Sequence, residues 1–526
     1  MKHTADCCLV SGQMSSEISR KGLIVFFALL LILNIILRFQ VVPHEIFPDS
    51  VFIHIMVNSL NEYGYARWIL HPLSLFGNYP GSMCSALQFL LSGIFQCTNL
   101  DMESVIFLYC VFIGCFSMFA AYIMASEIFD NDIFKLLTAF CLSTSPAILS
   151  YTTWTIPLRG LFIVFVPLLF YIMIKCLESK KYVLLFLSLL LLLFMTHHLS
   201  YFLIPSILIF IVLLISYKIY ALKPIKAYKV IPIIPVGCAI FAYSIPVLTG
   251  KFLETGSRYA PIADSYVRYV GIPIIFSIGG LFYLIFKERK TFGEWFLLLS
   301  LALIIMFIYI ETYMKWYMPL LLIPFAALGI FNLINTRSVK KIAPKILTII
   351  LITSICFSAY YQFIHFIPDT SKRTLNERFL EESTYQGGLW MRYYLNGSSI
   401  SNDRFFGNRI FAISERAYVL VPHLTINQIY GFNKINISEF KRYPITSEEF
   451  WFEGYTGPAI AERTWDYINQ MYIFYQNVGI KYFVENTRTN GDVLWHHGMY
   501  PSKLLHYAYE EKDNVYNNGK VRIWKL

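Results

Sequence analysis

Long apolar runs separated by short polar segments fill the chain from about residue 22 to residue 366. A helix that crosses a bilayer needs about 20 apolar residues, because each residue adds roughly 1.5 Å along the axis and the hydrocarbon core is about 30 Å thick. Eleven runs meet or approach this length, and we predict that each is a membrane-spanning helix. They are residues 22–40, 104–125, 133–150, 160–175, 182–197, 199–217, 231–248, 270–286, 294–310, 317–333 and 346–366.

The placement of Lys and Arg in alternate loops predicts how these helices are oriented. With the N-terminus inside, the inner segments before residue 367 hold eighteen Lys and Arg residues and the outer segments hold seven. Short loops on the inner side of a membrane carry an excess of these cations. We therefore predict a cytoplasmic N-terminus (1–21), a transmembrane domain (22–366) with a large first external loop (41–103), and an extracytoplasmic C-terminal domain (367–526).

The first external loop is predicted to contain two short helices. Residues 49–61 (DSVFIHIMVNSLN) have the apolar spacing of an amphipathic helix. Pro48 and Asp49 favour its start, and Gly64 favours its end. The apolar stretch Met83–Cys97 is short for a span, and counting it as one would invert every later loop. We therefore expect a helix that lies on or dips into the outer face.

The pattern changes after residue 367, where the sequence predicts a soluble α/β domain. Asn518-Gly519, between two β-prone segments, is a strong signal for a two-residue hairpin turn. The ten cysteines all precede this domain and include no CxxC pair, so we expect it to fold without disulfides or a zinc site. Helices are expected at 376–395 and 459–477, and strands at 399–402, 409–414, 418–421 and 480–485.

Composition supports a protein of the cell membrane with many spans. Apolar residues make up 56% of the chain and charged residues 14%, whereas soluble domains have about 45–50% and about 25%. Lys and Arg outnumber Asp and Glu by 43 to 33, but the excess lies before residue 367, where the count is 25 to 16. The basicity therefore belongs to the membrane part, and we expect the bilayer, not a nucleic acid, as a partner.

Ionisable residues gather at the predicted outer ends of the spans and are absent near mid-membrane. Ion-coupled transporters usually need such groups in the middle of the membrane, so the pattern argues against that class. Acids, histidines and cations at one face suit a reaction on a lipid-linked phosphate. A carboxylate can take a proton from an acceptor hydroxyl, and cations can stabilise charge on the leaving phosphate. The candidates are Glu45, Asp49, His54, Arg159, His197, His198, Arg258, Arg268, Glu311 and Lys315.

The layout of the chain resembles that of the GT-C class of polyprenyl-linked glycosyltransferases. It has one span, then a long external loop with an early acid (FPDSVFIHIMVNSLNEYGY), then a many-helix bundle and an external α/β tail. The segments beginning RGLFIVFVPLL and ETYMKWYMPLL are similar to archaeal members near the oligosaccharyltransferase catalytic subunit. The resemblance implies that Asp49 is the first-loop acid, which serves as base or metal ligand. It also implies that Lys315 faces the lipid phosphate.

Two parts of the oligosaccharyltransferase pattern differ in this chain. Residues 150–160 (SYTTWTIPLRG) lack the acid of the second external motif. The acceptor motif W-W-D-Y-G is at best echoed by Trp465-Asp466-Tyr467. A divalent metal is therefore possible but is not required by the sequence.

Three functions follow as hypotheses. The first is a membrane glycosyltransferase that moves a sugar from a polyprenyl (dolichyl-type) phosphate to an external acceptor, which is a glycan, a lipid or a protein. The second is an oligosaccharyltransferase-like enzyme of protein N-glycosylation, and the third is a non-catalytic lipid-binding or transport protein. Under the first we assign catalysis to Asp49, His54 and Glu45, phosphate binding to Lys315, Arg258, Arg268 and Arg159, and further site roles to His197, His198 and Glu311.

Several candidates also have a purely structural interpretation. Asp49 follows a proline and precedes an apolar run, as a helix cap does. The two histidines are compatible with anchoring at the membrane interface, and Lys315 and Arg268 with side chains that snorkel to it.

Overall fold

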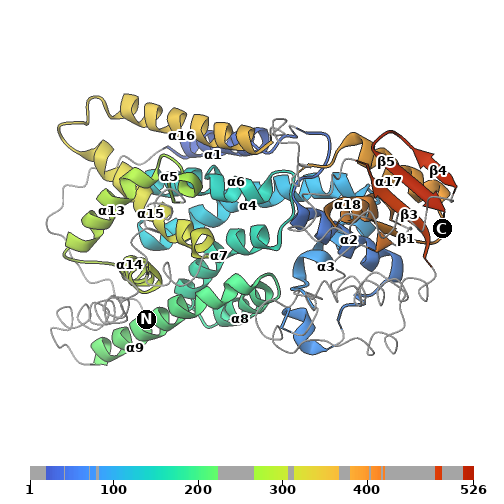
Figure 1. The fold of residues 1–526 in the computed structure, drawn as a ribbon. Coiled ribbons are helices and arrows are strands. Elements are labelled where there is room, and N and C mark those ends of the chain that lie inside the picture. Colours follow the sequence, from blue (N-terminus) through green and yellow to red (C-terminus); the bar gives the residue numbers. More distant parts are fainter. Residues whose placement is uncertain are drawn as a thin grey trace, which may run out of the picture.

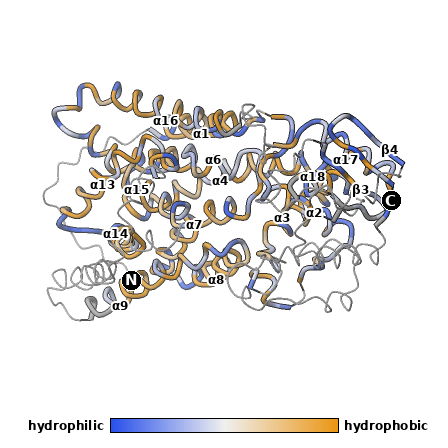
Figure 2. Tube along the Cα trace, in the orientation of Figure 1, coloured by the Kyte–Doolittle hydropathy of each residue, from blue (hydrophilic) through white to orange (hydrophobic). Residues whose placement is uncertain are grey.

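The fold is an elongated bundle of helices joined at one end to an α/β unit (Figure 1). The computed structural model describes residues 19–40, 42–69, 71–78, 82–222, 266–305, 313–366, 379–401, 404–415, 419–420, 480–487 and 513–525. Apolar residues dominate along the bundle, and hydrophilic segments are frequent in the α/β unit (Figure 2).

The described bundle consists of apolar helices of 7 to 27 residues. Five are long and apolar enough to cross a membrane, or up to six if one bent pair counts as a single span. The predicted span 231–248 lies outside the described residues, so the full number of eleven stays a prediction. The bundle helices are α1 (Arg20–Ile36), α4 (Met102–Ile128), α5 (Asp132–Ser143), α6 (Pro146–Thr152), α7 (Leu158–Lys175), α8 (Lys181–Phe194), α9 (Leu203–Leu222), α13 (Ile274–Phe286), α14 (Phe292–Ile304), α15 (Met314–Asn335) and α16 (Ala343–Phe366).

The predicted span 133–150 is broken into α5 and α6, whose axes differ by 52°. The break follows from Ser145 and Pro146. Pro146 has no backbone N–H to continue the hydrogen-bond ladder of α5 and is accepted as the first residue of α6. The hydroxyl of Ser145 accepts a hydrogen bond from the Ile148 N–H at 3.4 Å, so it caps the new helix.

Arg38 ties this broken pair to α1 from inside the bundle. Its guanidinium is fully buried and donates to the Asn34 side chain, to the carbonyl at the end of α5 (Ser143) and to the Thr152 hydroxyl of α6. A cation at a helix C-terminus interacts favourably with the orphan carbonyls there. Arg38 thus lies within the packed interior of the bundle.

Two short helices stand in the first loop, as predicted. The predicted helix 49–61 is α2 (Pro48–Tyr63), which buries nine side chains and ends at Gly64 with a left-handed φ of 73°. The predicted outer-face helix is α3 (Ala86–Thr98). Between them runs a one-turn 3₁₀ helix, η1 (Pro72–Leu75), and a second one, η2 (His198–Phe202), leads into α9.

A five-stranded sheet with two helices forms the described part of the C-terminal domain. The strand order is β2-β1-β3-β5-β4, with β1 parallel to β2 and β3, and β5 antiparallel to β3 and β4. The hairpin at Asn518-Gly519 is confirmed, with Gly519 at φ 86°. The predicted helix 459–477 lies outside the described residues. The elements are α17 (Glu382–Tyr394), β1 (Ser398–Ser401), α18 (Arg404–Ser414), β2 (Val419–Leu420), β3 (Ile480–Asn486), β4 (Asn514–Asn517) and β5 (Val521–Lys525).

The predicted strand at 409–414 is wrong, because this segment is the second half of helix α18. Phe406, Ile410 and Ile413 are all buried, at spacings of four and three residues. That spacing matches the helical period and gives α18 one continuous apolar face. Residues 409–414 alone are too short to show this period, which becomes apparent only when Phe406 is included.

The C-terminal domain docks on the first loop through α18, which packs against α2. Asn58 of α2 donates a hydrogen bond of 2.7 Å to the Ala412 carbonyl of α18. Ile46 and Phe379 form an isolated β-bridge between the loop and the start of the domain. The loop is therefore held between the bundle and the C-terminal domain, and this junction contains the largest concentration of the predicted site residues.

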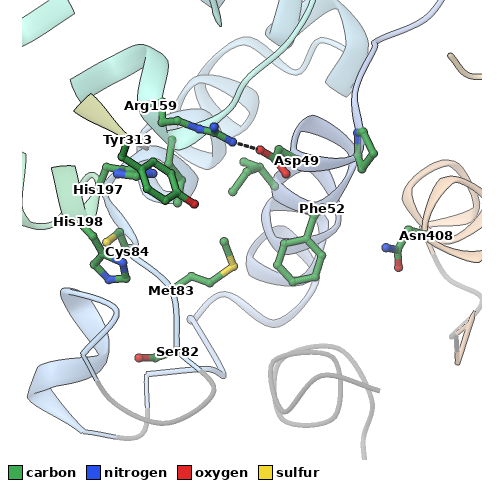
Figure 3. Close-up of a pocket in the computed structure, with 13 residues that line it drawn as sticks. Asp49, Phe52, Ser82, Met83, Cys84, Arg159, His197, His198, Tyr313 and Asn408 are labelled. Carbon is green, nitrogen blue, oxygen red and sulfur yellow. Dashed lines mark hydrogen bonds and ion pairs between the residues drawn. The ribbon is translucent and has the colours of Figure 1, made fainter. Parts of the chain in front are cut away.

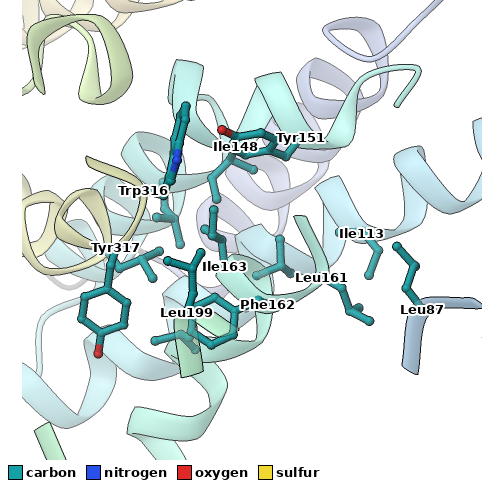
Figure 4. Packing of buried hydrophobic residues seen from close by; sticks show 14 of the residues in the cluster. Leu87, Ile113, Ile148, Tyr151, Leu161, Phe162, Ile163, Leu199, Trp316 and Tyr317 are labelled. Carbon is teal, nitrogen blue, oxygen red and sulfur yellow. The ribbon is translucent and has the colours of Figure 1, made fainter. Parts of the chain in front are cut away.

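Bundle helices reach close contact where glycines replace side chains. A Cβ on Gly280 of α13 would lie 1.9 Å from the Phe325 carbonyl oxygen of α15, and a Cβ on Gly329 of α15 would lie 2.0 Å from that of Phe276. Tyr151 and Trp316 meet edge to face, with 4.9 Å between ring centroids, among buried Leu and Ile side chains (Figure 4).

Candidate functional site

A cavity of about 350 Å³ lies at the junction of the bundle, the first loop and the C-terminal domain (Figure 3). Four of the predicted site residues, Asp49, Arg159, His197 and His198, line it together. They come from α2, from α7 and from the start of η2, which are far apart in the sequence. The full lining is Pro48, Asp49, Phe52, Ile53, Ser82, Met83, Cys84, Leu158, Arg159, His197, His198, Tyr313 and Asn408.

Asp49 stands in the first turn of α2 and is not its cap. The cap position is Phe47, which has a positive φ of 71° and makes no side-chain capping bond. The Asp49 carboxylate is instead 55% exposed and forms an ion pair with Arg159 Nη2. A negative charge in the first turn also interacts favourably with the helix dipole. The geometry leaves the carboxylate open to the cavity.

Arg159 stands in the first turn of α7 and is held by aromatic rings. Its guanidinium carbon lies 5.4 Å from the ring centroid of Tyr151 and 5.8 Å from that of Trp316. Such contacts between a cation and a ring face are attractive and restrict the side chain. Lys315 lies beside the cavity and not in its lining, with Nζ 4.9 Å from the Trp316 ring.

His197 and His198 form the wall that faces Asp49 across the cavity (Figure 3). His197 Nδ1 accepts a hydrogen bond of 2.9 Å from the Leu199 N–H and so caps η2. Because this nitrogen accepts, the neutral ring carries its proton on Nε2. The rings of His197 and Tyr313 are 6.3 Å apart, so both are placed to contact the same bound molecule.

Glu45 and His54 do not line the cavity. Both are buried, Glu45 just before α2 and His54 on the inward face of α2, at 2% and 4% exposure, and His54 Nδ1 lies 2.5 Å from Glu45 Oε1. The other oxygen, Oε2, accepts from Ser50 Oγ at 2.5 Å. Burial opposes the charged ring, but the Glu45 carboxylate raises the pKa of His54 above its ordinary value. This group therefore faces the interior, away from any substrate in the cavity.

The other predicted site residues lie apart from the cavity or outside the described residues. Arg268 is exposed on the helical segment 266–270, which precedes α13. Arg258, Glu311 and the segment Trp465-Asp466-Tyr467 fall outside the described residues. Sequence reasoning missed Tyr313, Cys84 and Asn408 as lining residues. Tyr313 stands two positions before Lys315, whereas Asn408 lies in α18 directly before the segment 409–414 that was predicted as a strand.

In the part of the chain that the structure describes, the donor set of the cavity does not fit a resident metal. Among the described residues, no group of three or more His, Cys, Asp and Glu side chains lies close enough together to hold a metal ion. Asp49 is the one carboxylate in the described lining of the cavity, and one of its oxygens is engaged by Arg159. We therefore derive no step through a metal.

No protein-family model and no curated protein sequence matches the chain, but solved structures do. Archaeal oligosaccharyltransferase AglB from Archaeoglobus fulgidus matches with a TM-score of 0.54 and 10% identity, over 88% of this chain and 69% of that chain. ArnT from Cupriavidus metallidurans matches at 0.56 and 8%, over 97% and 98%. Arabinofuranosyltransferase AftD from Mycobacteria matches at 0.51 and 12%, over 97% and 42%.

These three structures are glycosyltransferases of the GT-C class, and the matches cover most of this chain. Identities of 8 to 12% establish likeness of fold alone. This chain therefore has the fold of the GT-C glycosyltransferases.

Proposed function

We propose that this protein is a membrane glycosyltransferase that moves a sugar from a polyprenyl phosphate to an acceptor at the outer face of the membrane. The observation that carries the proposal is the pairing of a carboxylate, Asp49, with a guanidinium, Arg159, in one cavity at the end of an apolar bundle. The fold neighbours support the lipid: AglB was solved with a dolichol-phosphate and ArnT with undecaprenyl phosphate.

The two residues supply the two charges that the transfer needs. As the acceptor oxygen bonds to the anomeric carbon, the bond from that carbon to the phosphate oxygen breaks and the acceptor proton passes to Asp49. The electron pair leaves with the phosphate, where Arg159 stabilises the growing negative charge. A guanidinium has five N–H donors, so Arg159 can hold the phosphate while it keeps Asp49 in place.

The histidine wall completes the proposed donor site. His197 presents Nε2–H as a donor, because its Nδ1 is occupied by the Leu199 N–H. A donor at this position suits a phosphate or sugar oxygen. Lys315 contacts the Trp316 ring, and this contact holds its positive charge beside the cavity.

We also propose that the cavity faces the outside of the cell membrane. The support is the distribution of cations: with the N-terminus inside and eleven spans, eighteen Lys and Arg residues fall on the inner side and seven on the outer side before residue 367. In that arrangement the first loop and the C-terminal domain are both extracytoplasmic. An acceptor glycan, lipid or protein would then approach from that side.

An oligosaccharyltransferase-like enzyme that acts on peptides is the second candidate. The match to AglB, solved in complex with an inhibitory peptide, favours it. It predicts dependence on a divalent metal and loss of activity in Asp466→Ala. The third hypothesis, a non-catalytic protein, expects dispersed polar residues, and the convergence of Asp49, Arg159 and His197 on one cavity argues against it.

The decisive experiment is a donor turnover assay with purified protein and radiolabelled sugar on a polyprenyl monophosphate. We expect Asp49→Asn to lose about 100-fold or more of the turnover, since a positioned base contributes about 10²–10⁴-fold. Asp130→Asn, an exposed acid between α4 and α5, is the matched control and should keep wild-type turnover. A folded Asp49→Asn protein with full activity would refute the proposal. If the protein transfers only a pyrophosphate-linked oligosaccharide to a peptide and does not use the monophosphate donor, the second candidate is favoured.

A further inference from the structure

Ser50, the neighbour of Asp49 in the first turn of α2, links three parts of the junction through one hydroxyl. The side chain is fully buried. Its Oγ lies 2.5 Å from Glu45 Oε2, to which it donates, and it accepts a hydrogen bond of 3.1 Å from the Ile156 N–H. Ile156 belongs to the segment that leads into α7, where Arg159 stands. One hydroxyl therefore connects the element that carries Asp49 to the element that carries Arg159.

The direction of the Ser50 hydroxyl is fixed by a buried acid. A hydroxyl has one hydrogen, and the Glu45 carboxylate takes it, so a lone pair is left to face Ile156. Glu45 is itself held by His54 at 2.5 Å, and both are almost fully buried. Ser50 and His54 are four residues apart on α2, so they share one face of the helix. Asp49 is the residue before Ser50 and therefore points to a different side of the helix. The same helix thus directs Asp49 to the cavity and its anchors to the interior.

The two connected segments are also held in unfavourable backbone conformations. Phe47 has a φ of 71° and Trp154 a φ of 55°, a region that bulky residues rarely adopt. Ile46 N–H donates to the Trp154 carbonyl at 3.0 Å, which makes a second link between the segments. Conformations of this kind persist where surrounding contacts enforce them, and they are frequent at functional sites.

We infer that Ser50, held by Glu45 and His54, is a positioning residue that sets the separation between Asp49 and Arg159. The inference rests on the proposed function, in which these two residues act together on the donor. It gives Glu45 and His54 a role without contact to substrate, in agreement with their absence from the cavity lining.

Three variants and a control test the inference. Ser50→Ala removes the link, and we expect kcat to fall about 10- to 100-fold while the donor KM changes little, because misplacement by about 1 Å at a reacting group has that effect. Glu45→Gln keeps the shape of the side chain but removes the negative charge that orients the Ser50 hydroxyl and holds His54, so it should lower kcat similarly. Ser50→Thr keeps the hydroxyl and should restore most of the rate. Ser117→Ala removes a buried hydroxyl that bonds within its own helix, and should leave kcat unchanged.

A purely structural role predicts different results. The inference is wrong if Ser50→Ala and Glu45→Gln both keep kcat within about twofold of wild type. It is also wrong if the loss of kcat in these variants follows their loss of melting temperature and Ser50→Thr restores neither. A double mutant sharpens the test: Ser50→Ala should cost nothing further in the Asp49→Asn background, since its effect passes through Asp49. A full additional loss there would also overturn it.

A measurement without substrate separates this inference from the proposed function. We expect a cryo-EM structure of Ser50→Ala to show Asp49 and Arg159 no longer paired. If the pair is intact, the positioning role is refuted whatever the enzyme does. If the pair is broken while the wild-type protein turns over no polyprenyl-phosphate donor, the positioning role stands and the proposed function fails.

Discussion

The guanidinium of Arg159 lies over the indole ring of Trp316 at the edge of the cavity, with 5.8 Å between Cζ and the ring centroid. Trp316 is itself fixed by Tyr151 at 4.9 Å and by Tyr269 at 4.3 Å between ring centroids. Lys315 lies against the same indole. The cations proposed to face the donor phosphate are thus supported by a rigid aromatic surface, and this surface can be tested apart from the charges.

Replacing Trp316 should weaken donor binding without removing a charge. Trp316→Leu loses the ring face, and since a cation on an aromatic ring is worth about 0.5–2 kcal/mol, we expect the donor KM to rise about 3- to 10-fold. Trp316→Phe keeps a ring, so its donor KM should lie between those of wild type and Trp316→Leu. Steady-state kinetics with a polyprenyl-phosphate donor measures the effect. Equal KM values for all three proteins would show that the ring does not hold Arg159 for the donor.

Replacing Arg159 by Lys should be almost as damaging as replacing it by Met. Lys keeps the positive charge but has a compact ammonium in place of a planar fork, so it cannot bind a carboxylate and a phosphate together in the same geometry. We expect kcat/KM to fall about 100-fold or more in both variants. Lys315→Met, which changes a cation outside the cavity lining, should have a smaller effect. An Arg159→Lys enzyme with near-normal kcat/KM would argue that charge alone suffices.

The docking of the C-terminal domain should depend on pH through His44. This ring lies 3.2 Å from Glu103 and 3.2 Å from Glu382, and it stacks on Tyr385 at 4.0 Å. Burial opposes the charged ring, but the two carboxylates raise the pKa of His44, and hydrogen bonds from Gln386 and His44 lower that of Glu382. The contribution of His44 to stability is therefore complete below about pH 6.5 and is lost as pH rises through the raised value.

We accordingly expect the melting temperature of wild type to exceed that of His44→Gln most clearly near about pH 6 and least near about pH 9. The contribution of Glu382 is lost only as pH falls through its lowered pKa, so it does not reverse the trend in this range. His71→Gln, on the exposed η1 cap, is the control. A melting difference that does not change between these pH values would contradict the prediction.

The crossing of α13 and α15 should tolerate no side chain at its contact point. A Cβ at Gly280 would lie 1.9 Å from a backbone oxygen of α15, which cannot rotate away. We expect Gly280→Ala to destabilise the protein by about 1–3 kcal/mol, as overpacking does. Gly279→Ala is an ideal control, because nothing lies within 4 Å of a Cβ there. Melting temperatures in detergent compare the two, and equal values would show that the helices move apart without cost.

Much of the architecture was predictable because it follows from local pattern. The apolar runs predicted the bundle, and the Pro48-Asp49 start and Gly64 end predicted α2. Ser145-Pro146 is a local signal for the break between α5 and α6, but the apolar run continues on both sides of it and predicts a single span. Local signals of this kind fix an element and not its neighbours.

The site was predictable only in part, because it depends on which way each side chain faces. Asp49 and Arg159 were chosen for their place at the outer ends of elements, and they do meet. Glu45 and His54 lie as near in sequence, yet the rotation of α2 turns His54 to the interior. Asn408 reaches the cavity because α18 packs on α2, a contact between residues more than three hundred positions apart that no local pattern contains.

The cavity is lined from Pro48 near the start of the chain to Asn408 in the C-terminal domain, and this spread has a consequence for biogenesis. A ribosome adds about 5–20 residues each second, so roughly 20 to 70 s pass between the synthesis of its first wall and its last. During that interval Asp49 of α2 has been synthesised, while α18, which carries Asn408, has not. The cavity is therefore completed late, after the helices of the bundle have been synthesised, and α2 must stay in a state to which α18 can still bind.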